Sequence, residues 1–251
     1  MTPGPALSAR ELTVRYGGDT ALDAVTLDVP AGATVAVLGP NGSGKSTLFA
    51  AAIGLVAPAG GSIAAASRTA YLPQHLALEP SFPITVRDAV RMGRWGEVGW
   101  LGRLGRRDHA LVDGAMRALG LERLGDRRLS ELSGGQRQRA LVAQAAAQDA
   151  DLMLLDEPFT GVDRPTEEAI RRLVVDWREA GRTVLVATHD LERSATDFDL
   201  VLALNRRVVA FGPAAATCTD AVLLETFGGR VARLGERIID LDTHHHAHGS
   251  A

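Results

Sequence analysis

A short glycine-rich segment carries the residue types that hold a chain of phosphates. Residues 39–46 read GPNGSGKS, which fits the pattern G-x-x-x-x-G-K-[ST] between an apolar strand pattern and a helical pattern. The glycines let backbone N–H groups curl toward the phosphates, and the start of the helix adds its partial positive charge. Lys45 would supply an ammonium group to the β- and γ-phosphates, and Ser46 would hold Mg²⁺. We expect the nucleotide loop to comprise Gly39, Pro40, Asn41, Gly42, Ser43, Gly44, Lys45, Ser46 and Thr47.

Lys45 is the only lysine in the chain. The 27 basic residues are this lysine and 26 arginines (27 − 1 = 26), so arginine serves at every other cationic position. A guanidinium is planar and binds in a fork geometry, whereas an ammonium is a compact charge on a flexible stem that fits a narrow loop. The lysine therefore supports the interpretation of this segment as a phosphate site.

A second chemical element is a pair of carboxylates that ends an apolar run. Residues 152–158 read LMLLDEP, which is typical of a buried strand whose carboxyl end faces a ligand. We expect Asp156 to take part in the Mg²⁺ shell. Glu157 would orient or deprotonate the attacking water, because phosphoryl transfer depends mainly on in-line positioning and charge stabilisation.

A third element is a pair of glycines at a predicted helix start, in the sequence LSGGQRQR of residues 132–139. Ser133 can cap the helix, and the glycines leave backbone N–H groups open to an anion. The chain thus contains two predicted anion sites. Together the three elements resemble the ATP-binding-cassette ATPases, the nucleotide-binding subunits of transporters, whose signature is matched here by Leu132, Ser133, Gly134, Gly135 and Gln136.

The resemblance explains why there are two anion sites. In that family two subunits pack head to tail, and the signature of one closes over the γ-phosphate bound by the other. It implies an ATP-hydrolysing enzyme that uses ATP and Mg²⁺ and works as a homodimer.

Four other positions match motifs of the family. Tyr16 matches the aromatic residue that stacks on adenine, and Gln74 matches the glutamine that contacts Mg²⁺ and links the site to the membrane subunit. Asp163 matches the aspartate that crosses to the partner subunit, and His189 matches the histidine that senses the γ-phosphate. The resemblance therefore implies catalytic roles for Gln74, Glu157 and His189.

The elements that must position these residues follow from hydrophobic patterning. The expected fold is α/β: a P-loop nucleotide-binding fold with an antiparallel β edge and an all-helical subdomain inserted between core strands. Residues 11–18 and 21–30 alternate like half-buried antiparallel strands, and 134–147 has a helical pattern. The other expected elements are buried parallel strands at 34–38, 151–155 and 183–188 and helices at 45–55 and 165–179. The expected domains are a core of 1–84 and 148–228, a helical subdomain of 85–147 and a flexible tail of 229–251.

Composition excludes several classes of protein. The net charge of −3 gives no electrostatic footprint for nucleic acid, and Cys218 stands alone, which excludes a disulfide framework. The start of the chain lacks the pattern of a secretory signal, and the most apolar stretch, 48–66, is interrupted by glycines and a proline. We expect no nucleic-acid partner and a location inside the cell.

Two segments resemble the branch of the family that imports zinc and manganese. These are DEPFTGVD at 156–163 and the arginine- and tryptophan-bearing segment 82–108, which lies where the family docks its membrane subunit. The resemblance implies integral-membrane permease partners, a metal-binding extracytoplasmic protein and a position on the cytoplasmic face of the membrane. The resemblance of the whole sequence to that branch, together with the histidine-rich tail, favours zinc over manganese, with an iron chelate as a further cargo.

Four of the seven histidines lie near the end of the chain, at His244, His245, His246 and His248. Imidazole suits Zn²⁺, so these are candidate zinc contacts, although a flexible segment makes no defined tetrahedral site. The alternative is an inert low-complexity end or the remnant of a purification tag, and the alanine interruption and the short run argue against a standard tag. Two other classes of protein stay open: a soluble cassette ATPase without a transport role, and a metal-binding regulatory protein.

Overall fold

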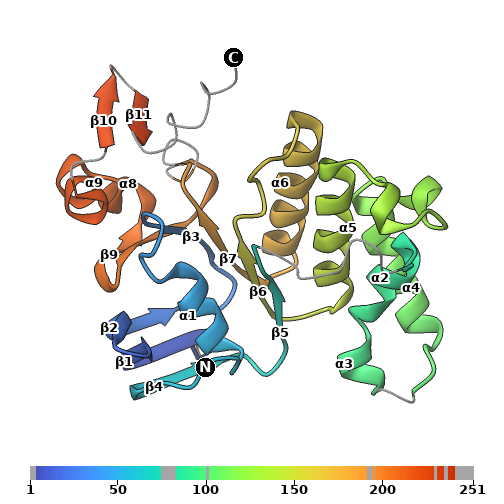
Figure 1. Ribbon diagram of the computed structural model, residues 1–251, viewed down its shortest axis with the longest axis horizontal. Coiled ribbons are helices and arrows are strands. Elements are labelled where there is room, and N and C mark those ends of the chain that lie inside the picture. Colours follow the sequence, from blue (N-terminus) through green and yellow to red (C-terminus); the bar gives the residue numbers. More distant parts are fainter. Residues whose placement is uncertain are drawn as a thin grey trace. The chain divides into compact units, whose positions relative to one another are not determined.

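The computed structural model describes residues 4–74, 83–99, 102–190, 194, 196–228, 231–234 and 237–240. The chain forms two compact units (Figure 1). The first unit consists of Met1–Ala65 and Leu185–Ala251, and the second unit consists of Ala66–Val184. The boundary falls inside strand β7 (Thr183–Thr188), whose residues are all buried.

The first unit contains an antiparallel three-stranded sheet. Strand β1 (Leu7–Tyr16) pairs with both β2 (Asp19–Val29) and β4 (Gly60–Ala65), giving the order β2-β1-β4. Along β1 the apolar residues are buried and several of the polar residues between them are exposed, as expected for a sheet with one face on the core. The predicted antiparallel edge is therefore confirmed.

A second sheet region of the first unit leads into the glycine loop. Strand β3 is paired in parallel with β8, and β8 is paired antiparallel with β9. All five residues of β3 are buried, which fits the continuous apolar run that predicted a core strand. The elements are β3 (Thr34–Leu38), α1 (Lys45–Ala52), β8 (Leu200–Asn205), β9 (Arg207–Pro213), α8 (Ala214–Thr217) and α9 (Asp220–Phe227).

The second unit combines parallel strands with the predicted helical segment. Strands β5 and β6 pair in parallel, and helix α5 lies between α6 and the pair α2 and α4 (Figure 1). Two short 3-10 turns lie at Glu122–Leu124 and Leu129–Glu131. The elements are β5 (Thr69–Leu72), α2 (Val86–Met92), α3 (Trp95–Val98), α4 (Arg106–Ala118), α5 (Gly134–Ala147), β6 (Leu152–Asp156) and α6 (Arg164–Glu179).

The predicted helices agree closely with the observed ones. Helix α5 has the predicted bounds, and α6 starts one residue before the predicted 165 because Asp163 caps it. Helix α1 ends at Ala52, three residues early, since Gly54 takes a left-handed φ of 75°. Within the part of the chain that the structure describes, no helix is both long and apolar enough to cross a bilayer.

The end of the chain differs from the prediction. Strands β10 (Val231–Leu234) and β11 (Arg237–Asp240) pair as an antiparallel hairpin inside the segment expected to lack regular structure. This corrects the expectation for these residues only. Each strand has four residues, which is too few for a periodic pattern to emerge from the sequence. The domain boundaries near residues 85, 147 and 229 stay predictions.

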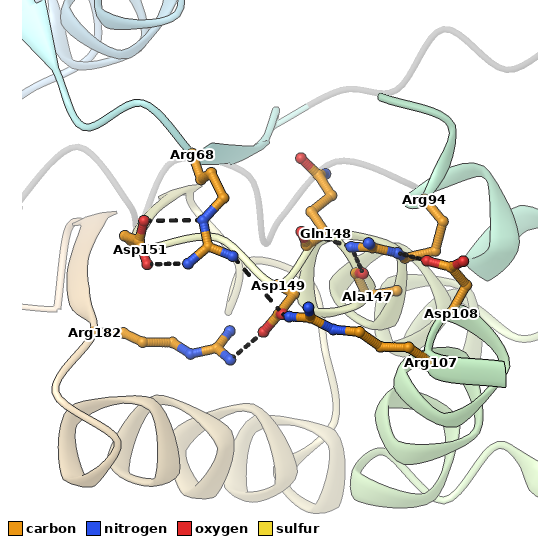
Figure 2. A network of polar contacts seen from close by, with 9 residues as sticks. All are labelled: Arg68, Arg94, Arg107, Asp108, Ala147, Gln148, Asp149, Asp151 and Arg182. Carbon is orange, nitrogen blue, oxygen red and sulfur yellow. Dashed lines mark hydrogen bonds and ion pairs between the residues drawn. The ribbon is translucent and has the colours of Figure 1, made fainter. Parts of the chain in front are cut away.

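The carboxyl end of α5 is held by a buried arginine (Figure 2). The guanidinium of Arg94 donates to the carbonyl oxygens of Ala147 at 3.0 Å and Gln148 at 2.9 Å, and to Oδ1 of Asp108 at 2.9 Å. These acceptors include the last helical carbonyls, which have no partner within the helix. Arg94 thus ties the end of α5 to the start of α4.

Asp149, just beyond α5, is surrounded by arginines from distant parts of the second unit (Figure 2). Its carboxylate accepts hydrogen bonds from Arg107 at 2.9 Å and from Arg182 at 2.5 Å, and it lies 3.9 Å from a nitrogen of Arg68. Arg68 also makes a two-bond contact with Asp151. Burial raises the pKa of Asp149, but the hydrogen bonds from Arg107 and Arg182 outweigh burial and lower it below its usual value.

Candidate nucleotide-binding and catalytic site

The glycine loop joins β3 to α1 under tight steric limits. A Cβ atom on Gly39 would lie 2.1 Å from the carbonyl oxygen of Leu204, which is far inside contact distance. Gly44 has a φ of 100°, and a Cβ there would lie 2.5 Å from Cδ2 of Leu22. Because no other residue fits either position, these glycines are required by the fold of the loop as well as by any ligand.

The middle of the loop is fixed by the backbone of Ser43. Its N–H group donates to the carbonyl oxygen of Pro40 at 3.1 Å, and its carbonyl oxygen accepts from the N–H group of Arg206 at 2.7 Å. The Ser43 side chain is buried. The loop is therefore a rigid turn rather than a free connection, which preorganises its N–H groups.

Lys45 turns back over the loop that precedes it. Its side chain is buried, and Nζ donates to the carbonyl oxygens of Gly39 at 2.6 Å and Pro40 at 3.2 Å. An ammonium group fits this narrow space as a point charge with rotatable donors, whereas a planar guanidinium is wider. The surroundings of Lys45 thus give a steric reason for the only lysine of the chain.

The first turn of α1 contains no acidic side chain. The N-cap of this helix is Gly44, which has no side chain to accept from the first amides. The N–H groups and partial positive charge of this turn, with the Lys45 ammonium, therefore suit a phosphate chain. Two exposed side chains of the same unit add to the predicted site: the hydroxyl of Ser46 and the ring of Tyr16, which is 52% exposed.

The carboxylate pair lies at the carboxyl end of β6 in the second unit. Asp156 is the last residue of the strand and is buried. Glu157 follows with a φ of 50°, a left-handed conformation that non-glycine residues rarely adopt. Such strain persists only where the surrounding structure holds it, and it is frequent at functional sites.

The structure brings Gln74 and Glu157 into direct contact. Nε2 of Gln74 donates to Oε2 of Glu157 at 2.8 Å, although the two residues are 83 positions apart. The same Oε2 accepts from the hydroxyl of Thr160 at 3.1 Å. Thr160 was not among the predicted site residues. The available signal was its place three residues after Glu157, directly before Gly161.

The predicted Mg²⁺ ligands fit that ion by their chemistry. Ser46 offers a hydroxyl oxygen, Gln74 an amide oxygen and Asp156 a carboxylate, and Mg²⁺ prefers oxygen ligands with few contributed by the protein. Among the described residues, the structure has no group of three or more His, Cys, Asp or Glu side chains that could hold a metal. Ser46 belongs to the first unit, and Gln74 and Asp156 belong to the second.

The signature sequence forms a capped helix start. The hydroxyl of Ser133 accepts from the Gln136 N–H group at 3.3 Å, and the Gln136 side chain accepts from the Ser133 N–H group at 3.1 Å. This reciprocal pair is a capping box, which fixes the first turn of α5. The amides of Gly134 and Gly135 lie in that turn.

The starts of α5 and α6 lie against each other. A Cβ on Gly135 would be 2.9 Å from both Oδ1 of Asp163 and the hydroxyl of Thr166, so the second glycine of the signature permits this close approach. Asp163 caps α6 by accepting from the Thr166 N–H group at 3.3 Å. The hydrogen bond from the Thr166 hydroxyl lowers the pKa of Asp163, which is therefore ionised at neutral pH.

The remaining predicted residues are placed only in part. His189 follows β7 directly and is exposed. The tail residues His244, His245, His246 and His248 lie outside the described residues. Of the predicted docking segment 82–108, helices α2 and α3 are described, with Trp95 51% exposed.

Comparison with known proteins gives consistent matches. A family profile described as "ABC transporter" matches residues 22–160. The chain is 42% identical over 235 residues to the "Zinc transport system ATP-binding protein TroB" of Treponema pallidum (strain Nichols), covering 90% of this chain and 88% of that protein. It is 39% identical over 236 residues to the "Manganese transport system ATP-binding protein MntB" of Bacillus subtilis (strain 168), covering 91% and 94%.

A solved structure described as "An inward-facing conformation of a putative metal-chelate type ABC transporter" has the same fold. It matches with a TM-score of 0.80 at 29% identity, and the match covers 94% of this chain and 95% of that chain. The predicted α/β nucleotide-binding fold, with its antiparallel sheet and helical subdomain, is thereby confirmed.

Proposed function

Because this chain belongs to the ABC transporter family and is an ATPase of that family, we propose that it powers an importer for a divalent metal, with zinc as its cargo. The observation that carries the proposal is the 42% identity to a zinc-transport ATP-binding protein over 90% of the chain. The zinc assignment depends on this relationship, since the residues that would bind ATP do not contact the cargo.

In the proposed reaction the first unit supplies most of the phosphate contacts. Lys45 and the first-turn N–H groups of α1 bind the β- and γ-phosphates, and Tyr16 stacks on the base. Bound Mg²⁺, which Ser46, Gln74 and Asp156 would hold, neutralises charge on the phosphates. Glu157 accepts the proton of the attacking water, and His189 contacts the γ-phosphate.

The proposed assembly contains two copies of this chain in head-to-tail arrangement. Ser133 and the glycines of the signature would face the nucleotide of the other copy, and Asp163 would cross to it. The chain would sit on the cytoplasmic face of the membrane through permease subunits docked on residues 82–108. A metal-binding protein outside the membrane would deliver the cargo.

Metal uptake in cells that carry or lack this chain tests the proposal. We expect loss of the chain to abolish energy-dependent accumulation of ⁶⁵Zn, and a Lys45→Ala variant to fail to restore it. An excess of unlabelled Mn²⁺ should compete weakly. Unchanged zinc accumulation would overturn the zinc assignment.

Manganese is the second candidate cargo, favoured by the 39% identity to a manganese-transport ATP-binding protein. The same cells distinguish it, because loss of ⁵⁴Mn uptake with intact ⁶⁵Zn uptake would assign the system to manganese. If zinc and manganese uptake both stay intact and iron-chelate uptake is lost, an iron chelate is favoured as the cargo. ATPase activity of the purified chain is expected in all three cases.

A further inference from the structure

We propose that Thr160 is a positioning residue for ATP hydrolysis: its hydroxyl holds the carboxylate of Glu157 in the orientation that accepts a proton from the attacking water. The proposal rests on the proposed role of Glu157 as the general base. In this role Thr160 acts only through Glu157.

The contact between the two residues is built into one turn of the backbone. The Thr160 N–H group donates to the Glu157 carbonyl oxygen at 3.2 Å, and the Thr160 hydroxyl donates to Oε2 of Glu157 at 3.1 Å. The left-handed φ of Glu157 directs the chain into this turn. Backbone and side chain of Thr160 therefore both hold the same glutamate.

The second donor on the same oxygen defines the orientation of the carboxylate. Nε2 of Gln74 also bonds Oε2 of Glu157, at 2.8 Å, from a different segment. Two donors on Oε2 oppose rotation of the carboxylate, and hydrogen bonds to an ionised acceptor are the stronger kind. Among the residues that the structure describes, both hydrogen bonds to this carboxylate end on Oε2 and none reaches Oε1, so Oε1 is the oxygen assigned to the water.

Neighbouring contacts keep the turn in place. Nε2 of Gln138, on the signature helix α5, donates to the carbonyl oxygen of Pro158 at 3.2 Å. The guanidinium of Arg171 lies over the ring of Phe159, 4.4 Å from its centre. Thr160 follows these two anchored residues, so its hydroxyl is presented to Glu157 by a fixed backbone.

The test compares two substitutions that differ in the hydroxyl. Thr160→Val keeps the shape and removes the donor, whereas Thr160→Ser keeps the donor. We expect Thr160→Val to lower kcat for ATP by ~10-fold, the size of one lost hydrogen bond to a charged group, with KM changed less than about 2-fold. Thr160→Ser should stay within about 3-fold of the unsubstituted protein. Thr160→Ala provides a second donor-free variant if the valine impairs folding.

The split between kcat and KM, together with retained activity in Thr160→Ser, is the readout that a purely structural role would not move.

A double substitution separates this proposal from the role of Glu157. In a Glu157→Gln background, which has no base, adding Thr160→Val should change the residual rate less than about 2-fold. If Glu157→Gln alone hydrolyses ATP normally, the base assignment fails, and the positioning role fails with it. Two outcomes would overturn the positioning role alone, provided that Glu157→Gln is slow. In the first, Thr160→Val is as active as the unsubstituted chain. In the second, adding Thr160→Val to Glu157→Gln lowers the residual rate by a further ~10-fold.

Discussion

At the scale of single residues, Lys45 is determined by its surroundings. Its ammonium is buried against two carbonyl oxygens of the loop that it would serve. We expect Lys45→Ala to lower ATP turnover at least ~100-fold, because the ammonium charge that would stabilise the transferred phosphate is lost. Lys45→Arg should fail to a similar degree, because the wider guanidinium does not fit the narrow loop. Phosphate release by the purified variants measures both effects.

The control for these variants is Arg10→Ala. Arg10 forms an exposed ion pair with Asp28 at 2.8 Å, which contributes little to stability. This variant should keep normal turnover. Normal turnover in Lys45→Arg would show that charge alone is needed and that the steric explanation of the lone lysine is wrong.

The sequence predicts the local geometry at the candidate site better than the contacts between distant residues. The loop at 39–47 and the signature at 133–136 are local patterns, and their capping and backbone geometry follow from neighbours in the chain. The bond between Gln74 and Glu157 spans 83 positions and depends on the pairing of β5 with β6. No local pattern contains that contact. The hydroxyl of Thr160 lies only three positions from Glu157, and it was missed because the residue types do not reveal the left-handed φ of Glu157 that precedes this turn.

At the scale of secondary-structure elements, Asp149 links α4, α5 and two strand starts through its arginines (Figure 2). We expect Asp149→Asn to lower the free energy of unfolding by about 2 kcal/mol at pH 7, because the arginines lose a charged acceptor. Asparagine keeps the shape and tolerates the left-handed φ of 54°. Thermal and urea unfolding at fixed pH measure the change.

The pH dependence of this loss has a defined sign. The arginine contacts lower the folded-state pKa of Asp149, so its stabilisation is present above the unfolded pKa of about 3.9. It disappears as the pH falls through the lower, folded-state pKa, and the two proteins should then converge in stability. Asp113→Asn is the matched control, since its pair with Arg87 is half-exposed and should contribute under about 1 kcal/mol. Equal effects of both substitutions would contradict the special role of Asp149.

The two ends of α5 show what a sequence can predict about an element. Its start is fixed by the neighbouring residues Ser133 and Gln136, which form the capping box, and the helix bounds were predicted correctly. Its end depends on Arg94 and on the arginines around Asp149, which come from residues 68 to 182. Their meeting is a product of tertiary packing, so hydrophobic periodicity carries no sign of it.

At the scale of the whole molecule, the proposed dimer can be trapped by Glu157→Gln. This substitution keeps shape but removes the base, so ATP should bind and be hydrolysed at least ~100-fold more slowly. We expect the variant to form a dimer with ATP and Mg²⁺, because the signature of each copy would hold the nucleotide of the other. Light scattering measures the mass with ATP, with ADP and without nucleotide. A monomer under all three conditions would count against the head-to-tail arrangement.

The tail histidines provide a separate test of how the end of the chain relates to the metal. Four imidazoles fall within residues 244–248, outside the described part of the chain. Neutral imidazoles bind Zn²⁺, and protonation near an unperturbed pKa of about 6.5 releases it. Removal of residues 243–251 should therefore reduce zinc binding at pH 7 far more than at about pH 5, while ATP turnover stays near normal. Titration calorimetry with Zn²⁺ on both proteins measures the difference.

A matched variant with alanine at His244, His245, His246 and His248 retains the chain length and should lose zinc as the truncation does. If the truncation loses zinc and the alanine variant retains it, other groups of the tail bind the metal. Equal zinc binding by all three proteins would make the tail an inert end. A collapse of ATP turnover on truncation alone would show instead that the tail stabilises the ATPase, since none of its residues belongs to the motifs that bind the nucleotide. In that case the boundary predicted near residue 229 would be wrong, and the hairpin of β10 and β11 would be the place to look for the connection.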